Sequence, residues 1–439
     1  MERRDFLKSA GAGLTAALAG APAVLGAQSP NDTLGVACIG VGTRGFQLLK
    51  EVQACPNTEV RIICDLYKPN VERARQACKN PNVRLVHEWE KAVSDKNVDA
   101  VVIATPDFWH ATMTVAAAGN KKDVYCEKGL CRTLAEAKAV RKAIQDNQRV
   151  LQLGHHYNSM AHFQKARELY QSGILGKCPM IRMYIDRTNP YPEWKFYAQY
   201  DINELPAEAT RENIDWNRFL AHAENKDRPF DPERFFRWRN WWEYGTGIAG
   251  DLMSHLWDSV NLVTGLGIPE SVMTQGDLYF WKGDRDVPDQ WHVLYDYPKK
   301  ETAMSFECVF HNKHRGELAQ YLGREKTLEV SPRFLRVYDG EWKPSWKEVG
   351  AAARKRAQVV PELGLSPDEL GAPESVYPAS NDWWGGGHMR NFIDCVRSRQ
   401  TPNCGMQRAY EEAVTIALSV EAYRQERKVR WDSVKEEIV

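Results

Sequence analysis

Apolar runs alternate with helical patterns along the chain from residue 34 to residue 154. We predict strands at 34–39, 59–64, 84–87, 98–104, 123–126 and 150–153. Between them, we predict helices at 44–54, 69–78, 108–118 and 134–147. Strands that alternate with helices are typical of a parallel sheet built from right-handed crossovers. The pattern therefore predicts a doubly wound α/β domain.

A different pattern begins after residue 154. Predicted strands alternate apolar and polar residues or pair through short turns, as in an antiparallel sheet, at 180–186, 271–279, 291–297, 302–309, 317–321 and 327–330. Two irregular stretches rich in proline and charge, 189–231 and 343–382, are predicted to be insertions or lids over a cleft. The chain ends with two predicted amphipathic helices, at 388–399 and 407–427, and a strand at 429–431.

These patterns together predict an α/β protein with two domains. A doubly wound α/β domain at 32–154 would come first. An α+β domain at 155–439 would follow, with a large, mostly antiparallel open sheet and the C-terminal helices at 388–427. The chain is long enough for two domains of ordinary size.

The first 27 residues are typical of an export signal. A twin-arginine signature at 3–8 precedes a weakly apolar run at 9–25 and a small-residue cleavage site near Ala27. The run is too rich in glycine for a membrane span. We therefore expect the twin-arginine machinery to export the protein, to the periplasm or beyond. Because this machinery moves folded proteins, we also expect a cofactor that is loaded in the cytoplasm.

Charge and cysteine content exclude several classes of function. Lysine and arginine number 58, as do aspartate and glutamate, so nothing favours binding to nucleic acid or to an anionic membrane. The ten cysteines contain no C-x-x-C pair and are expected to be reduced core residues. We expect no metal site, since Asp251 and His255 lack a third ligand that can be placed.

A glycine-rich turn follows the first predicted strand. Gly40, Gly42 and Gly45 form a G-x-G-x-x-G motif that leads into a helix. Such a motif is the phosphate-binding opening of a dinucleotide fold, so we expect the domain at 32–154 to be a Rossmann dinucleotide-binding domain. Asp65 ends the second strand, 20 residues after Gly45, where a carboxylate binds the adenosine ribose. An acid there repels a 2′-phosphate, so NAD is favoured over NADP. A helix-capping role for Asp65 is the alternative.

Three further stretches carry candidate chemistry. Thr105, Pro106 and His110 follow the fourth strand, and Glu127 and Lys128 follow the fifth, both at the sheet edge where such folds bind ligands. The third stretch leads into a predicted helix that contains Asp251 and His255. Because these two residues are four positions apart, their side chains would lie on one face of that helix.

With these stretches, the chain resembles the Gfo/Idh/MocA family of glucose-fructose oxidoreductase and inositol dehydrogenase. The resemblance covers nearly the whole chain after the signal, including the closing segment at 391–399. It implies a catalytic role for Lys128, with Asp251 and His255 as partners. Gly129 departs from the family pattern, which has proline there. Glycine frees the backbone that proline would fix, so the placement of Lys128 is in question.

The residue chemistry agrees with hydride transfer from a carbinol. His255 would be the base and Lys128 would stabilise the alkoxide charge, while Asp251 would orient substrate hydroxyls or hold His255. The residues expected to contact the cofactor are Gly40, Gly42, Thr43, Arg44, Gly45, Asp65, Thr105, Pro106, His110, Glu127 and Lys128. Those expected to contact a carbohydrate are His156, Tyr157, Trp238, Trp242 and Tyr244.

We therefore predict an oxidoreductase that uses a tightly held NAD, less favourably NADP, on a sugar, polyol or glycoside. One alternative is an NAD-dependent glycosidase that oxidises C3 transiently and eliminates the C1 substituent. A second alternative is a redox-silent sugar-binding protein. The resemblance also implies a homo-oligomer.

Overall fold

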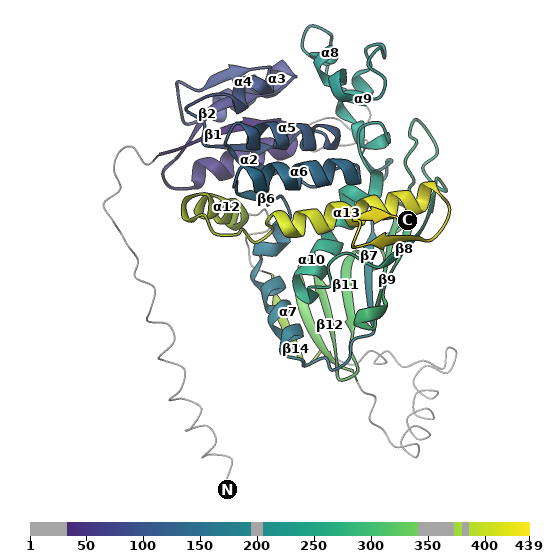
Figure 1. Cartoon of the computed structure of the whole chain (residues 1–439). Helices are drawn as coiled ribbons and strands as arrows, with labels where there is room; N and C mark the ends of the chain where they lie inside the picture. Colours follow the sequence, from purple (N-terminus) through teal and green to yellow (C-terminus); the bar gives the residue numbers. More distant parts are fainter. Residues whose placement is uncertain (1–32, 195–204, 341–372, 380–385) are drawn as a thin grey trace, which may run out of the picture. The chain divides into compact units, whose positions relative to one another are not determined.

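The structure is a computed structural model that describes residues 33–194, 205–340, 373–379 and 386–439. The predicted export signal at 1–27 lies outside the described residues, as does most of the irregular stretch at 343–382. Figure 1 labels the helices and strands discussed below.

The first half of the described chain contains a six-stranded sheet in the order β3-β2-β1-β4-β5-β6, and every neighbouring pair is parallel. The strands are β1 (Leu34–Ile39), β2 (Thr58–Cys64), β3 (Arg84–Val86), β4 (Ala100–Ile103), β5 (Asp123–Cys126) and β6 (Leu151–Leu153). The helices between them are α2 (Thr43–Ala54), α3 (Lys68–Ala77), α4 (Trp89–Val93), α5 (Asp107–Gly119) and α6 (Leu134–Asp146). The predicted doubly wound domain is confirmed.

Local sequence explains why these elements form. β4 is buried along its whole length, as parallel strands covered on both faces are. α6 begins with a capping box in which Thr133 accepts from the Glu136 amide and Glu136 accepts from the Thr133 amide. The strand order reverses between β1 and β4, which is the point where ligands bind in such sheets.

The second sheet has ten strands in the order β14-β13-β12-β11-β7-β10-β9-β8-β15-β16. The strands are β7 (Met180–Asp186), β8 (Ser271–Asp277), β9 (Gln290–Tyr297), β10 (Thr302–Val309), β11 (Glu317–Leu322), β12 (Lys326–Ser331), β13 (Phe334–Asp339), β14 (Ser375–Pro378), β15 (Val429–Asp432) and β16 (Glu437–Ile438). The sheet is mostly antiparallel, as predicted, but β7 and β10 pair in parallel. The pattern of the sequence did not predict β13, β14 or β16.

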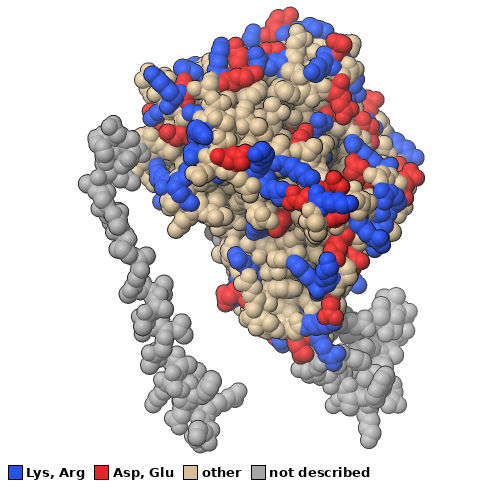
Figure 2. Space-filling model, viewed as in Figure 1, with Lys and Arg blue, Asp and Glu red and all other residues tan. Residues whose placement is uncertain are grey.

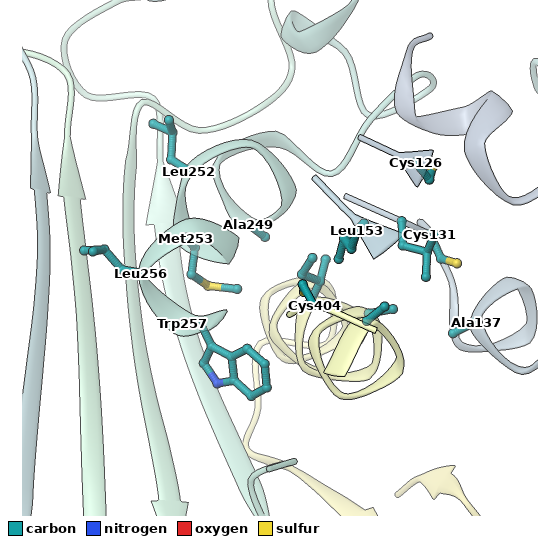
Figure 3. Packing of buried hydrophobic residues seen from close by; sticks show 14 of the residues in the cluster. Cys126, Cys131, Ala137, Leu153, Ala249, Leu252, Met253, Leu256, Trp257 and Cys404 are labelled. Atoms are coloured by element: carbon teal, nitrogen blue, oxygen red, sulfur yellow. The ribbon is translucent and has the colours of Figure 1, made fainter. Parts of the chain in front are cut away.

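A long helix near the end of the chain, α13 (Met406–Arg424), contacts both sheets. The short helix η1 (His156–Ser159) and helix α7 (Ala161–Gln171) follow β6. Later in the chain, a π-helical turn, η4 (Ala249–Met253), runs directly into α10 (Ser254–Thr264). α13 contacts α6 and β6 on one side and β8 on the other (Figure 1). Figure 3 shows Met253 and Trp257 beside the α13 helix, while Leu256 points toward the large sheet.

α12 (Gly386–Ser398) packs with the parallel sheet rather than with the large one. Met389, Phe392 and Ile393 are fully buried in a cluster with Val36 and Leu48 of the first domain. The sequence pattern predicts this helix to be part of the α+β domain at 155–439, the expected substrate domain. Its apolar stripe completes the core of the Rossmann sheet instead, because α2 leaves an apolar face open there.

Charged side chains of both signs are interspersed over the face in Figure 2. No helix among the described residues is both long enough and apolar enough to span a membrane.

Candidate active site

A cavity lies along the carboxyl edge of the parallel sheet, where β1 and β4 end. Most of the residues predicted to contact a cofactor line it, namely Gly40, Gly42, Thr43, Arg44, Asp65, Thr105 and Pro106. Gly45, His110, Glu127 and Lys128 are not among its lining residues; they lie behind or beside it. The predicted cofactor residues therefore meet at one edge of the sheet.

The glycine turn has the geometry that a phosphate site needs. Gly40 has a φ of +78°, and a Cβ there would stand 2.7 Å from the Ala104 carbonyl oxygen. A Cβ on Gly45 would stand 1.8 Å from the Gly40 carbonyl oxygen, so only glycine lets α2 approach its strand. No side chain caps the start of α2, so its first amides can face an anion in the cavity.

Asp65 ends β2 and lines the cavity, as predicted for a ribose-binding carboxylate. Its Oδ2 accepts from the Val41 amide at 2.7 Å and its Oδ1 from the Tyr67 amide at 2.9 Å. Burial raises the pKa of Asp65, and these hydrogen bonds oppose that rise. Asp65 therefore shapes the turn between β2 and α3 while it faces the cavity. No side chain caps α2 or α3, so the helix-capping alternative is wrong.

Arg44 forms an ion pair with Glu127 beside the turn. Its Nε lies 2.9 Å from Glu127 Oε1, and its Nη1 lies 3.2 Å from Glu51 Oε1. Burial opposes ionisation of Glu127, but Arg44 outweighs it and lowers the pKa of that carboxyl. Two carboxylates thus balance the charge of Arg44, which makes it a poor partner for the 2′-phosphate of NADP.

His110 connects the two strand-end stretches. Its Nδ1 lies 2.8 Å from the Gly129 carbonyl oxygen and its Nε2 lies 2.8 Å from the Thr105 carbonyl oxygen. Both ring nitrogens donate only in the protonated ring. Burial by itself lowers the pKa of His110, but Cys126 and the two carbonyl groups outweigh it and raise that pKa to about 9. His110 therefore bridges the Thr105 and Lys128 stretches, and its protonated form can donate to both carbonyl groups.

Lys128 is fixed by the start of the π-helical turn. Its Nζ donates to Asp251 Oδ1 at 2.7 Å and to the Asp251 carbonyl oxygen at 2.6 Å. Gly129, which raised doubt about its placement, packs against Gly250. The lysine is therefore held from the substrate domain, across 123 residues of sequence.

Asp251 accepts hydrogen bonds from three side chains. Besides Lys128, Arg239 Nε donates to its Oδ1 at 2.8 Å and Trp194 Nε1 donates to its Oδ2 at 2.6 Å. Burial opposes ionisation, but Lys128 and Arg239 outweigh it and hold the pKa of Asp251 far below its usual value. No hydrogen bond from Asp251 to His255 is found, so the carboxylate orients Lys128 rather than the histidine.

His255 lies one turn further on, against rings that follow β6. Ring centroids lie 5.3 Å away for His155, 6.1 Å for His156 and 5.6 Å for Tyr157. Burial, and then the positive charge of Lys128, lower the pKa of His255 well below its usual value. Its Nδ1 has no hydrogen-bond partner among the described residues. The ring of His255 is therefore neutral, and its buried Nδ1 is left without a partner among the described residues.

A buried acid lies behind His255 that the sequence analysis missed. Glu412 of α13 is 0% exposed, and its Oε1 lies 3.0 Å from Nε2 of His155, which is 1% exposed. Burial raises the pKa of Glu412, and His155 opposes that rise. Glu412 stands in a helix whose pattern indicates only core packing, so its sequence carried no signal of this contact.

The residues that we predicted to contact the substrate do not all lie at one site. His156 and Tyr157 surround His255, and Trp238 lines the cavity beside Arg239. Trp242 instead stacks on Tyr423, 5.8 Å between ring centroids, and Tyr244 is 0% exposed. Trp242 and Tyr244 thus serve the hydrophobic core, as large aromatic residues most often do.

The described residues contain no cluster of three or more His, Cys, Asp or Glu side chains that could hold a metal ion.

Comparison with known families identifies the class of protein. The model described as "Oxidoreductase family, NAD-binding Rossmann fold" matches residues 34–155. The model described as "Oxidoreductase family, C-terminal alpha/beta domain" matches residues 159–304. Together they match more than half of the chain. The chain belongs to the Gfo/Idh/MocA oxidoreductase family, and its first sheet is that family's NAD-binding domain.

Individual relatives align over part of their length. A glycosyl hydrolase family 109 protein from Solibacter usitatus is 33% identical over 151 residues, 30% of this chain and 34% of that protein. An inositol 2-dehydrogenase from Mycolicibacterium smegmatis is 26% identical over 193 residues, 44% of this chain and 54% of that protein. The chain thus spans between a third and about half of the length of the curated relatives it matches.

Solved structures show the same fold over almost the whole chain. A levoglucosan dehydrogenase in complex with NADH and levoglucosan has a TM-score of 0.63 at 17% identity. The match covers 90% of this chain and 99% of that one. At this identity, the likeness supports the fold alone.

Proposed function

We propose that this protein is an NAD-dependent oxidoreductase that acts on a ring carbinol of a sugar, polyol or glycoside. The observation that carries the proposal is the Lys128–Asp251 contact beside the neutral His255. Asp251 links the ammonium group of Lys128 to Arg239, which lines the cavity, and the charge of Lys128 acts on His255. A cation and a base are what loss of hydride from a carbinol requires.

The residues around the cavity fit a dinucleotide. The uncapped start of α2 and the turn at Gly40 and Gly42 would hold the pyrophosphate, and Asp65 would bind the adenosine ribose. NAD, when bound, would accept the hydride from the carbinol carbon and could later give it up again. Since Asp65 and the paired Arg44 disfavour a 2′-phosphate, NAD is preferred to NADP.

The side chains divide the remaining work. His255 would remove the hydroxyl proton, since a neutral imidazole can accept a proton. Lys128 would stabilise the alkoxide that forms, from a position that Asp251 fixes. His156 and Tyr157 would contact the sugar from the side of β6, and Trp238 from the side of the cavity.

A second candidate is a glycosidase that works through transient oxidation at C3. The glycosyl hydrolase family 109 relative favours it. A C3 carbonyl acidifies the C2 proton, a base removes that proton, and the C1–O bond breaks with its electron pair on the leaving group. Addition of water across C1 and C2, followed by reduction at C3, restores a sugar. The same Lys128, Asp251 and His255 would serve both reactions.

The test begins with the purified full chain. Denaturing it and identifying the released nucleotide by mass establishes whether NAD is carried. Incubation of the intact protein with varied glycosides in heavy water then distinguishes the reactions. A ketosugar or lactone without cleavage supports the oxidoreductase, and deuterium at C2 of a released sugar supports the glycosidase. Bound nucleotide with neither product would leave only a redox-silent sugar-binding protein.

A matched pair of variants checks the assignment of the lysine. Lys128→Met should lose turnover, while Lys142→Met, whose side chain is 76% exposed on α6, should keep it. Equal turnover in both variants would contradict the role of Lys128.

We also propose that the protein is exported by the twin-arginine machinery and retains its nicotinamide. The signature at Arg3 and Arg4 supports export, and a compartment without free NAD would require retention. Replacing both arginines by lysine should keep the protein in the cytoplasm, measured by fractionation of cells. Unchanged distribution between the fractions would contradict the proposal.

A further inference from the structure

One wall of the dinucleotide cavity comes from a distant part of the chain. We call residues 213–239 the cover segment; it includes α8 (Trp216–Phe219), η2 (Leu220–His222) and α9 (Pro232–Phe236) and extends into η3 (Trp238–Asn240). Six of its side chains line the cavity together with the glycine turn, namely Arg218, Phe219, Phe235, Phe236, Trp238 and Arg239. A molecule in this cavity is therefore contacted by the Rossmann domain and by the cover segment together.

Backbone hydrogen bonds attach the cover segment beside the ribose carboxylate. The Lys68 amide donates to the Asn213 carbonyl oxygen, and the Asp215 amide donates to the Leu66 carbonyl oxygen, each at 3.0 Å. Tyr67 and Ile214 form an antiparallel bridge between these two bonds. The cover segment thus forms a short antiparallel backbone contact with the turn that follows Asp65.

Aromatic packing strengthens the attachment. Tyr67, which follows Asp65 by two residues, meets Phe236 edge to face with ring centroids 5.1 Å apart. Phe219 meets Phe108 of α5 in the same way at 5.3 Å. Ile214 is 2% exposed and Phe219 is 1% exposed, so the segment packs as core rather than as a loose loop. Such aromatic pairs add to the effect of the buried area.

We propose that the cover segment retains the bound dinucleotide, so that release is slow compared with turnover. The inference rests on the proposed function, since it assumes that a dinucleotide occupies the cavity. Phe235, Phe236 and Trp238 would cover the ligand on the face away from the glycine turn. To leave, the ligand must lose its contacts with one wall, and both walls are held together by the bridge at Tyr67 and Ile214.

The test measures release of nucleotide and needs no substrate. The purified full chain is loaded with NADH, excess NAD is added, and loss of bound NADH fluorescence gives the release rate. Phe236→Ala removes a ring that lines the cavity and contacts Tyr67, and we expect release to become at least about tenfold faster. Phe230→Ala is the matched control, because Phe230 packs on Trp216 in the same segment without lining the cavity.

A second measurement keeps the test decisive if Phe236→Ala folds poorly. In the wild-type chain, bound NADH should slow hydrogen exchange of the amides at Lys68 and Asp215. The inference would be overturned if Phe236→Ala released NADH at the wild-type rate. It would also be overturned if the hydrogen-exchange rates of the Lys68 and Asp215 amides were the same with and without NADH. Absence of any nucleotide binding by the wild-type chain would instead overturn the proposed function, and the inference with it.

Discussion

Replacing Asp251 by asparagine tests the centre of the proposed site. The carboxylate accepts from Lys128, Arg239 and Trp194, and its side chain is 13% exposed. Asparagine keeps the shape but removes the charge, and its amide group turns a donor toward donors. Two cations would then remain in a mostly buried place without their counter-charge.

The magnitude follows from the burial of the pair. Removing one partner of a buried ion pair costs about 3–5 kcal/mol. Lys128 is 11% exposed and Arg239 is 21% exposed, so partial screening favours the lower end, about 3 kcal/mol. We expect this loss in the free energy of unfolding, measured by urea titration. If the same energy positions Lys128 in the transition state, turnover falls about 100-fold.

The pH dependence provides an independent check. The folded pKa of Asp251 lies far below its unfolded value of about 3.9, so its stabilising effect is present above that pH and is lost as the pH falls. The stability difference between the wild type and Asp251→Asn should therefore shrink below about pH 4.

Asp258→Asn, on the next turns of α10, is the control for stability. Asp258 is 0% exposed and pairs with Arg408 at 2.7 Å, away from Lys128. The substitution Asp258→Asn should lower the free energy of unfolding but leave the turnover of each folded molecule unchanged. The reasoning would be refuted if Asp251→Asn kept turnover within about threefold of the wild type, or if it unfolded at the same urea concentration.

Three further predictions concern the dinucleotide side of the site. The pKa of His110 is raised to about 9, so its stabilising effect is complete below about pH 6.5 and is lost as the pH rises through about 9. Urea titrations should show wild-type stability falling by about 3 kcal/mol between pH 6 and pH 10, relative to His110→Gln; parallel curves would contradict this. Gly45→Ala should unfold at a lower temperature, since its Cβ would stand 1.8 Å from the Gly40 oxygen. Gly42→Ala has room, with its nearest neighbour at 3.8 Å, so it should melt normally yet carry less nucleotide; normal nucleotide content would argue against a phosphate at this turn.

Short-range pattern determined much of the fold. Buried runs and helical spacing predicted all six strands of the parallel sheet, and the signal is clearest in β4, β5 and β6, which are buried along their whole length. The glycine turn was predictable for a local reason, since Gly40 has a positive φ and a Cβ on Gly45 would meet the Gly40 carbonyl oxygen. Lys128, Asp251 and His255 were candidates from strand-end position, spacing and resemblance. Their catalytic roles stay predictions.

Tertiary structure alone decided which side chains meet. Nothing near Asp251 in the sequence signals that Trp194, 57 residues earlier, donates to its carboxylate. Glu412 reaches His155 across 257 residues, and the cover segment reaches Tyr67 by a bridge too short to leave a strand pattern. Local periodicity reflects which face of an element is buried. It cannot specify which distant element buries that face, and the site of this protein depends on those distant contacts.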